Sequence, residues 1–164
     1  MAKRPHRFHS LLHSADILEK RLATLLTPVG ITPRQARILH MLARVGDVPQ
    51  TVLTEEFDIT SGSMSTMIDR LLKLGMINRR KNPKDRRGDL ISLTDRGKAV
   101  LADVRDVWRE IDELVAEKLG DARAGLLHEL TRDLKFALGG HVPGHGLKRK
   151  PGDIEPIAEK IHET

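Results

Sequence analysis

The stretch that decides the fold is "SGSMSTMIDRLLKLGMINRRKNPKDRRGDLISLTDRG", residues 61–97. Its first part places five apolar residues on one side of a helix, and Gly75 is suited to end that helix: Met64, Met67, Ile68, Leu71 and Leu72. The following part alternates apolar and polar residues on both sides of a basic segment rich in Gly and Pro. It predicts a hairpin of two short strands with a long tip. A polar helix followed at once by a basic hairpin is therefore expected.

The positive charge of the chain is concentrated in this stretch. Residues 61–98 carry ten Lys or Arg against four Asp, whereas the net charge of all 164 residues is only +5. A local basic patch favours an anionic partner.

The composition also limits where the protein works. There is no cysteine, which excludes disulfides and thiolate metal sites, and we expect a reducing cytoplasm. The basic start, Met1 to Phe8, is not followed by the apolar segment of a secretion signal. No run approaches the roughly 18 apolar residues of a membrane helix, so no membrane association is expected.

Helices are predicted on both sides of the basic stretch. Apolar residues recur at intervals of three and four from Phe8 to Leu26, and Thr32 with Gln35 forms a capping box for a second helix that begins at Pro33. A short third helix follows Pro49. After the hairpin, the helical period holds from residue 95 to 119 and again in a last leucine-rich helix. Residues 139–164, rich in Gly, Pro and charge, are interpreted as an arm or a flexible tail.

These elements predict a mainly α fold with a small β-hairpin wing. Residues 31–94 form a winged helix-turn-helix that binds DNA, and residues 1–30 and 95–138 form flanking helices. The apolar stripes of the flanking helices are too long for a small domain to bury alone, which favours a homodimer. The alternative is a monomer with a self-contained helical bundle.

The polar helix has the side chains that recognition of double-stranded DNA requires. A helix that enters the major groove, about 12 Å wide, needs short hydrogen-bonding side chains at its leading end. We expect that role for Ser61, Gly62, Ser63 and Thr66, although N-capping by Ser61 is the simpler alternative. Arg70 and Lys73 lie further along the helix and are expected to contact phosphate, with a surface ion pair as the alternative for Arg70. Asp69 is expected to serve local pairing.

The hairpin has the charge that a minor groove attracts. Arg86 and Arg87 are expected at its tip, where guanidinium groups enter narrow A·T-rich stretches. Asp85 is expected to fork onto Arg87 and to orient it. The cations of the strand approach, which we expect to contact phosphate, are Arg79, Arg80, Lys81 and Lys84. A solvated basic loop is the alternative.

These residues resemble the core of the MarR family of bacterial transcription regulators. In that family a D-R-L helix end and a glycine precede a D-x-R wing and an L-T-x-x-G helix start. The matching residues here are Asp69, Arg70, Leu71 and Gly75, then Asp85 and Arg87, then Leu93, Thr94 and Gly97. The resemblance covers roughly residues 8–138. It implies a dimer that binds a palindromic operator, usually as a repressor, and releases it when a small ligand binds. Without cysteine, the thiol-oxidation sensing of some relatives is ruled out.

The resemblance also implies an effector site between the dimerisation helices and the DNA-binding region. The candidates by position are His13, Arg37, His40 and Trp108. An aromatic carboxylate or another organic anion is the expected effector. Polar contacts between helices are the alternative for Arg37 and His40, and core packing or a dimer seam for Trp108.

Metal and enzyme sites are not expected. His6, His9 and His13 follow the spacing of zinc ligands on one helix face, but neighbouring Lys and Arg residues would repel a cation. No nucleophile with a base, phosphate-binding loop or apolar carboxylate pair is present, so neither an enzyme nor a cofactor is predicted. The competing function is a winged helix that binds RNA or a protein partner.

Overall fold

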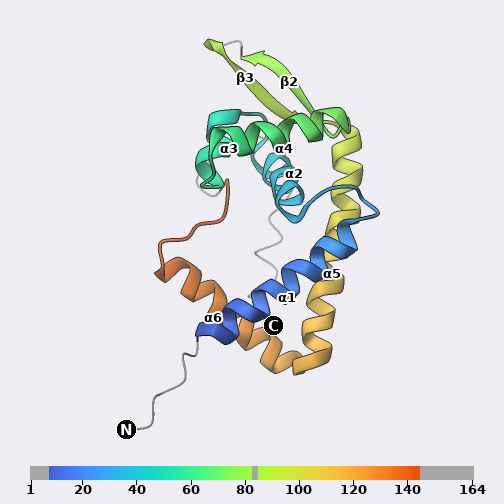
Figure 1. The fold of residues 1–164 in the computed structure, drawn as a ribbon, viewed down its shortest axis with the longest axis vertical. Helices are drawn as coiled ribbons and strands as arrows, with labels where there is room; N and C mark the ends of the chain where they lie inside the picture. Colours follow the sequence, from blue (N-terminus) through green and yellow to red (C-terminus); the bar gives the residue numbers. More distant parts are fainter. Residues whose placement is uncertain (1–7, 83–84, 145–164) are drawn as a thin grey trace. The chain divides into compact units, whose positions relative to one another are not determined.

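The computed structural model describes residues 8–82 and 85–144, with only the backbone for residues 85–88. It is mostly helical with one small antiparallel sheet, which confirms the predicted fold class (Figure 1). The elements are α1 (Phe8–Leu26), α2 (Pro33–Val45), β1 (Val48–Pro49), α3 (Gln50–Glu56), α4 (Ser61–Lys73), β2 (Ile77–Asn82), β3 (Asp85–Leu93), α5 (Asp95–Leu119) and α6 (Asp121–Ala137).

The chain divides into two compact units. The first, here called the helical unit, contains residues up to Arg37 and Ala99–His141. The second, here called the winged unit, contains Ile38–Lys98 and, of the residues after α6, Val142 to Gly144. The predicted division into dimerisation helices, DNA-binding region and arm assigns functions to these segments and stays a prediction.

The winged unit packs its helices and its sheet around one apolar core. Fully buried side chains come from α2, α3, α4 and both long strands: Ile38, Leu39, Leu42, Leu53, Met64, Ile68, Leu71, Ile77 and Ile91. The sheet order is β1-β3-β2, with Val48 opposite Ile91 and Ile77 opposite Leu93. Strand β1 has only two residues, too few to produce an alternating sequence pattern, and it was not predicted.

Side-chain caps determine where three helices begin. The predicted capping box of α2 is confirmed, because Thr32 N donates to Gln35 Oε1 (3.0 Å) and Gln35 N donates to Thr32 Oγ1 (3.2 Å). Thr94 caps α5, as its Oγ1 accepts from Gly97 N (3.0 Å). In α4 the cap is Thr60, whose Oγ1 accepts from Ser63 N (3.3 Å), so the alternative of capping by Ser61 is wrong.

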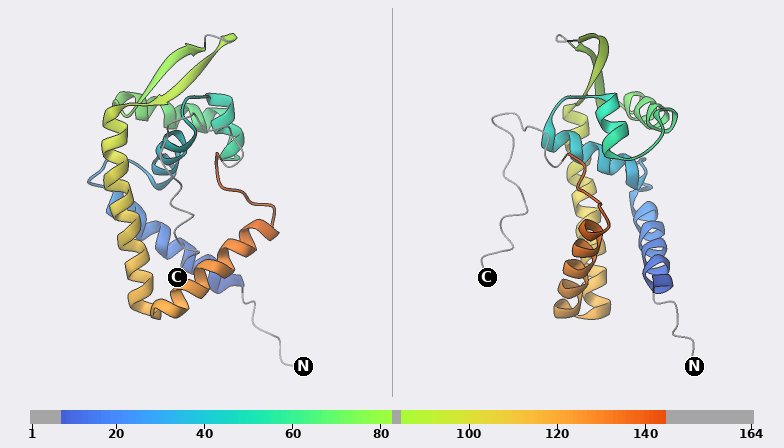
Figure 2. Two further views of the ribbon diagram at one scale, coloured as in Figure 1. Left: turned by 180° about the vertical axis from the view of Figure 1, so that it is seen from behind. Right: turned by 90° about the vertical axis from the view of Figure 1, so that its left-hand side faces the viewer.

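The wing has longer strands than expected. Strands β2 and β3 remain paired out to Asn82 and Asp85, with an irregularity between Lys81 and Asn82. Residues 83–84 lie outside the described residues. Arg86 and Arg87 lie within β3 and not in a long loop. Only Ile77 of β2 is buried, because the hairpin extends beyond the three helices of its unit (Figures 1 and 2).

The helical unit leaves much of its apolar surface in contact with solvent. Helix α1 buries only Leu26, and α6 buries no residue. The stripe on α6 consists of Leu126, Leu130, Leu134 and Leu138, which are 43% to 78% exposed. Such an extended apolar surface on a single chain usually marks an interaction site.

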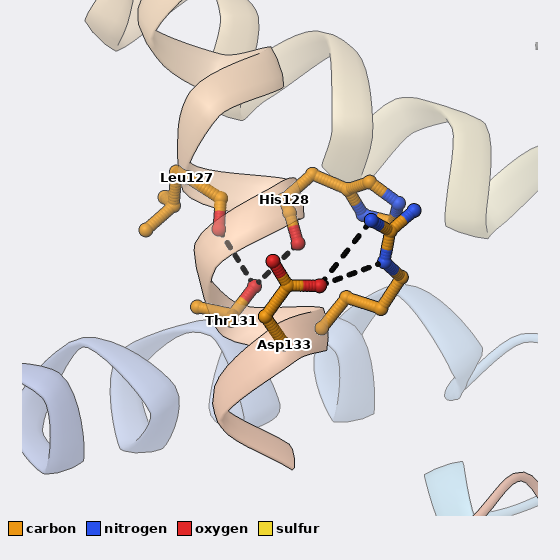
Figure 3. A network of polar contacts seen from close by, with 5 residues as sticks. Leu127, His128, Thr131 and Asp133 are labelled. Atoms are coloured by element: carbon orange, nitrogen blue, oxygen red, sulfur yellow. Dashed lines mark hydrogen bonds and ion pairs between the residues drawn. The ribbon is translucent and has the colours of Figure 1, made fainter. Parts of the chain in front are cut away.

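The polar side chains of α6, in contrast, have partners within the helix itself. Figure 3 shows Thr131 Oγ1 between the carbonyl oxygens of Leu127 (2.7 Å) and His128 (3.1 Å). Arg132 Nε and Nη2 both lie 3.3 Å from Asp133 Oδ1. These polar groups therefore have partners within α6, whereas the leucine stripe remains largely exposed.

The predicted arm is described only as far as Gly144. Gly139 has a φ of +80° at the end of α6, and Val142 to Gly144 belong to the winged unit. The rest of the arm, residues 145–164, lies outside the described residues. In the described ranges, no helix combines the length and the apolar character needed to cross a membrane.

Candidate nucleic-acid interface

Helix α4 is held by one face and offers the other to solvent. Met64, Ile68 and Leu71 are completely buried, at positions i, i+4 and i+7. The predicted DNA-contacting residues lie on the exposed side of the same helix: Ser61, Gly62, Ser63, Thr66, Arg70 and Lys73. The core contacts therefore fix the helix while its short polar side chains remain accessible.

Local hydrogen bonds determine whether each hydroxyl on this surface can still donate or accept a hydrogen bond. Thr60 Oγ1 donates to Ser63 Oγ (3.0 Å), so the Ser63 hydroxyl proton remains available. Thr66 Oγ1 donates to the Gly62 carbonyl (3.1 Å), which leaves Thr66 as an acceptor. Toward a base edge, Ser63 can thus donate and Thr66 can accept.

A polar network joins α3, α4 and the wing. Gln50 Nε2 donates to Ser65 Oγ (2.8 Å), and Gln50 Oε1 accepts from Arg79 Nη2 (3.3 Å). Arg79 Nη2 also lies 3.6 Å from Asp69 Oδ1, so Asp69 pairs with strand β2 and not locally within its own helix as predicted. Sequence reasoning missed Gln50, because it lies 15 residues from Ser65 and 29 from Arg79.

The cations of strand β2 are paired with carboxylates of the chain. Arg80 forms an ion pair with Asp47, in the turn before β1. Lys81 Nζ lies 2.8 Å from Oδ1 of Asp89, its direct cross-strand neighbour. Including Arg79, three of the cations expected to contact phosphate are therefore paired with a carboxylate of the chain. All three remain exposed.

The side chains of the remaining predicted wing residues lie outside the described part of the structure. Strand β3 contains Asp85, Arg86 and Arg87, of which only the backbone is described, and Lys84 lies outside the described residues altogether. The orientation of Arg87 by Asp85 stays a prediction.

Two of the four effector candidates line one recess in the helical unit. This recess, of about 460 Å³, is formed by Leu18, Glu19, Leu22, Pro33, Arg37, Trp108 and Ile111. Most of these side chains, including the Trp108 ring, are apolar, and the two charged ones are Glu19 and Arg37. His13 is exposed on α1 and His40 is half-buried in the winged unit, and neither lines this recess.

A second recess, lined by α1 and α5, is acidic. It measures about 400 Å³ and is lined by Arg21, Leu25, Glu110, Ile111, Glu113, Leu114 and Glu117. A hydrogen bond from Lys118 and its positive charge lower the pKa of the Glu117 carboxyl, so that group stays ionised. Arg21 lies 3.9 Å from Glu110. Three carboxylates make this recess unfavourable for an anion.

Metal ligands do not gather among the residues that the structure describes. No group of three His, Asp or Glu side chains in that part of the chain is arranged to hold a metal ion. His6, the first member of the predicted histidine row, lies outside the described residues.

The fold and the exposed α4 surface define a winged helix protein. A sequence model described as the MarR family matches residues 29–88, which include α3, α4 and most of the wing. This part of the chain is similar to the MarR family of transcriptional regulators.

Relatives in this family match parts of the chain. The multiple antibiotic resistance protein MarR of Salmonella typhimurium is 34% identical over 82 residues, which are 50% of this chain and 57% of that protein. The HTH-type transcriptional regulator FarR of Neisseria gonorrhoeae is 27% identical over 124 residues, 76% of this chain and 85% of FarR. The chain thus spans little more than half the length of the MarR relative.

Solved structures share the fold over most of their length. The transcriptional regulator PA4135 is 26% identical, with a TM-score of 0.68 over 81% of this chain and 98% of that one. A mutant MarR from E. coli, complexed with operator DNA, gives a TM-score of 0.69 at 23% identity, over 79% of this chain and 94% of that one.

Proposed function

We propose that the chain regulates transcription by binding double-stranded DNA as a homodimer at a palindromic operator. The observation that carries the proposal is the exposed, hydroxyl-rich start of α4 beside a cationic hairpin in one unit. The family match over residues 29–88 supports it, because that range contains both features. Such a regulator acts where the chromosome is, so the cytoplasm stays the predicted location.

In this proposal α4 enters the major groove and the wing enters the adjacent minor groove. Ser61, Ser63 and Thr66 read base edges, and the absence of a side chain at Gly62 permits close approach. Arg70 and Lys73 contact phosphates, and Arg87 enters the minor groove. Replacing Arg87 with Ala is expected to weaken operator binding by about 1 to 3 kcal/mol.

The proposal is tested with an operator selected from a pool of random duplexes. Affinity for that operator, a random duplex and a single-stranded RNA is then measured over a range of salt concentrations. Specific duplex binding keeps a large affinity ratio as salt rises, because phosphate contacts alone weaken with salt. Equal affinity for the three nucleic acids would refute the proposal, and preferential RNA binding would support the competing function.

Two variants separate phosphate contacts from structural cations. Lys73 is exposed and forms no ion pair with any described residue, so Lys73→Ala is expected to reduce the salt slope by about one. The charge of Arg80 is shared with Asp47, and Arg80→Ala is expected to change that slope less. Equal effects of the two variants would assign Arg80 to the DNA contact.

The exposed apolar stripes support a homodimer. A second copy of α1 and α6 would cover Leu126, Leu130 and Leu134, which a single chain leaves exposed. A twofold dimer also places two recognition helices about one DNA turn apart. Light scattering during gel filtration is expected to show a dimer, and Leu130→Asp to shift it toward the monomer. His128→Asp, at an exposed position on the polar side of α6, is the matched control.

The proposed effector is an organic anion that binds the recess beside Trp108 and releases the operator. Arg37 supplies the positive charge, and Leu18, Leu22 and Ile111 supply apolar contacts. Since Trp108 is the only tryptophan, its fluorescence reports occupancy directly. Benzoate is expected to change this fluorescence in the wild type and much less in Arg37→Gln. No change with a series of aromatic and aliphatic carboxylates would refute this site.

Repression is the proposed direction of regulation. A reporter gene placed behind the selected operator is expected to be more active without the protein than with it. Lower activity without the protein would identify an activator instead.

A further inference from the structure

We infer that Val142 to Gly144 form a latch, an internal docking contact through which the arm binds the helix-turn-helix. The docking surface consists of the last turn of α2 and the last residue of α3: Met41, Arg44, Val45 and Glu56. Its occupant is the chain itself, directly after α6. This inference does not depend on DNA binding.

Two hydrogen bonds hold the backbone of the latch. The Gly144 N–H donates to Glu56 Oε2 (2.7 Å), a short bond that the carboxylate charge strengthens. Arg44 Nη1 donates to the Pro143 carbonyl (3.3 Å). The partners lie 88 and 99 residues apart in the chain, so these bonds arise from tertiary packing. They offset part of the entropy that is lost when the arm is ordered.

Gly144 fits this surface because it lacks a side chain. It is buried and has a φ of +81°, a conformation that favours glycine. A Cβ at this position would lie 2.8 Å from Val45 Cγ1 and 3.1 Å from Met41 Cγ. The backbone of Gly144 thus packs directly against the side chains of Met41 and Val45 in α2.

The latch restrains the element that precedes α4. Glu56 is the last residue of α3, and only residues 57–60 separate it from the recognition helix. The chain crosses from one unit to the other after Arg37, after Lys98 and after His141. The latch begins immediately after the third crossing, at Val142. Val142 to Gly144 are therefore anchored to the helix-turn-helix and belong to it structurally.

Hydrogen exchange on the full chain tests this inference. The Gly144 amide is expected to exchange at least about tenfold more slowly than an unstructured glycine amide. In Glu56→Ala this protection should be lost, and the amides of residues 57–59 should exchange faster. Glu56→Gln keeps an acceptor oxygen and should retain part of the protection. An unprotected Gly144 amide in the wild type would overturn the latch.

A matched pair of glycine variants provides an independent test. Gly139 has nearly the same φ, +80°, but a Cβ there would meet nothing within 4 Å. Gly139→Ala thus carries the backbone strain alone, whereas Gly144→Ala adds the clash with α2. Only Gly144→Ala is expected to expose residues 57–59 to faster exchange. Identical exchange in the two variants would overturn the inference. Because no measurement involves DNA, a failure to bind DNA leaves these tests unaffected.

Discussion

Gly97 allows the start of α5 to pack against the turn after α4, and its replacement gives the sharpest test of the fold. A Cβ at Gly97 would lie 2.0 Å from the Met76 carbonyl oxygen and 2.7 Å from Leu93 Cδ1. Ordinary carbon contacts are about 3.5 to 4.0 Å, so the helix must move by more than about 1 Å to accept Ala.

That movement breaks the bonds that attach α5 to the turn. Thr94 N donates to the Met76 carbonyl (3.1 Å), and Thr94 Oγ1 donates to the Gly75 carbonyl (2.7 Å). Overpacking costs about 1 to 3 kcal/mol, and each lost bond costs about 0.5 to 1.5 kcal/mol. The higher helix propensity of Ala returns at most about 1 kcal/mol. We expect Gly97→Ala to destabilise the protein by about 2 to 4 kcal/mol.

Thermal unfolding at a fixed protein concentration measures this effect, because the proposed homodimer would unfold in a concentration-dependent way. The expected fall in Tm is roughly 4 to 16 °C. Gly62→Ala is the control: a Cβ at this helical position meets nothing within 4 Å, so its Tm should stay the same or rise. If Gly97→Ala were as stable as Gly62→Ala, the close approach between α5 and Met76 would be refuted.

Three further substitutions test the helix-turn-helix. Thr60→Ala removes the cap of α4 and is expected to lower stability by about 1 kcal/mol in urea unfolding, whereas Ser61→Ala should have little effect. Gln50→Met keeps the side-chain length but loses both hydrogen bonds of the Gln50 side-chain amide. It is expected to reduce the preference for the operator over random duplex, and an unchanged ratio would exclude Gln50 as a positioning residue. Asp58 has a φ of +47°, so Asp58→Gly should raise stability by about 0.5 to 1 kcal/mol, and a loss would contradict this.

The spacing of apolar residues and the capping residues explain why much of the fold could be predicted from the sequence. Apolar residues at helical spacing located α1, α2, α4 and α5, because each helix must bury one face. The capping box at Thr32 and the cap at Thr94 also follow from residue types only three positions apart. The exposed polar face of α4 could be predicted for the same reason: its period follows directly from the chain.

What the sequence determined by itself is therefore local: the order of the helices, their polar and apolar faces, and the basic hairpin. Tertiary structure alone decided which charges are shared, as for Arg80 with Asp47, and where the arm docks, as for Gly144 with Glu56. It also selected Arg37 and Trp108, among the four effector candidates, to line one recess. The physical reason is distance along the chain. Helical periodicity and caps connect residues within one turn, whereas ion pairs and docking contacts connect residues that only the folded backbone brings together.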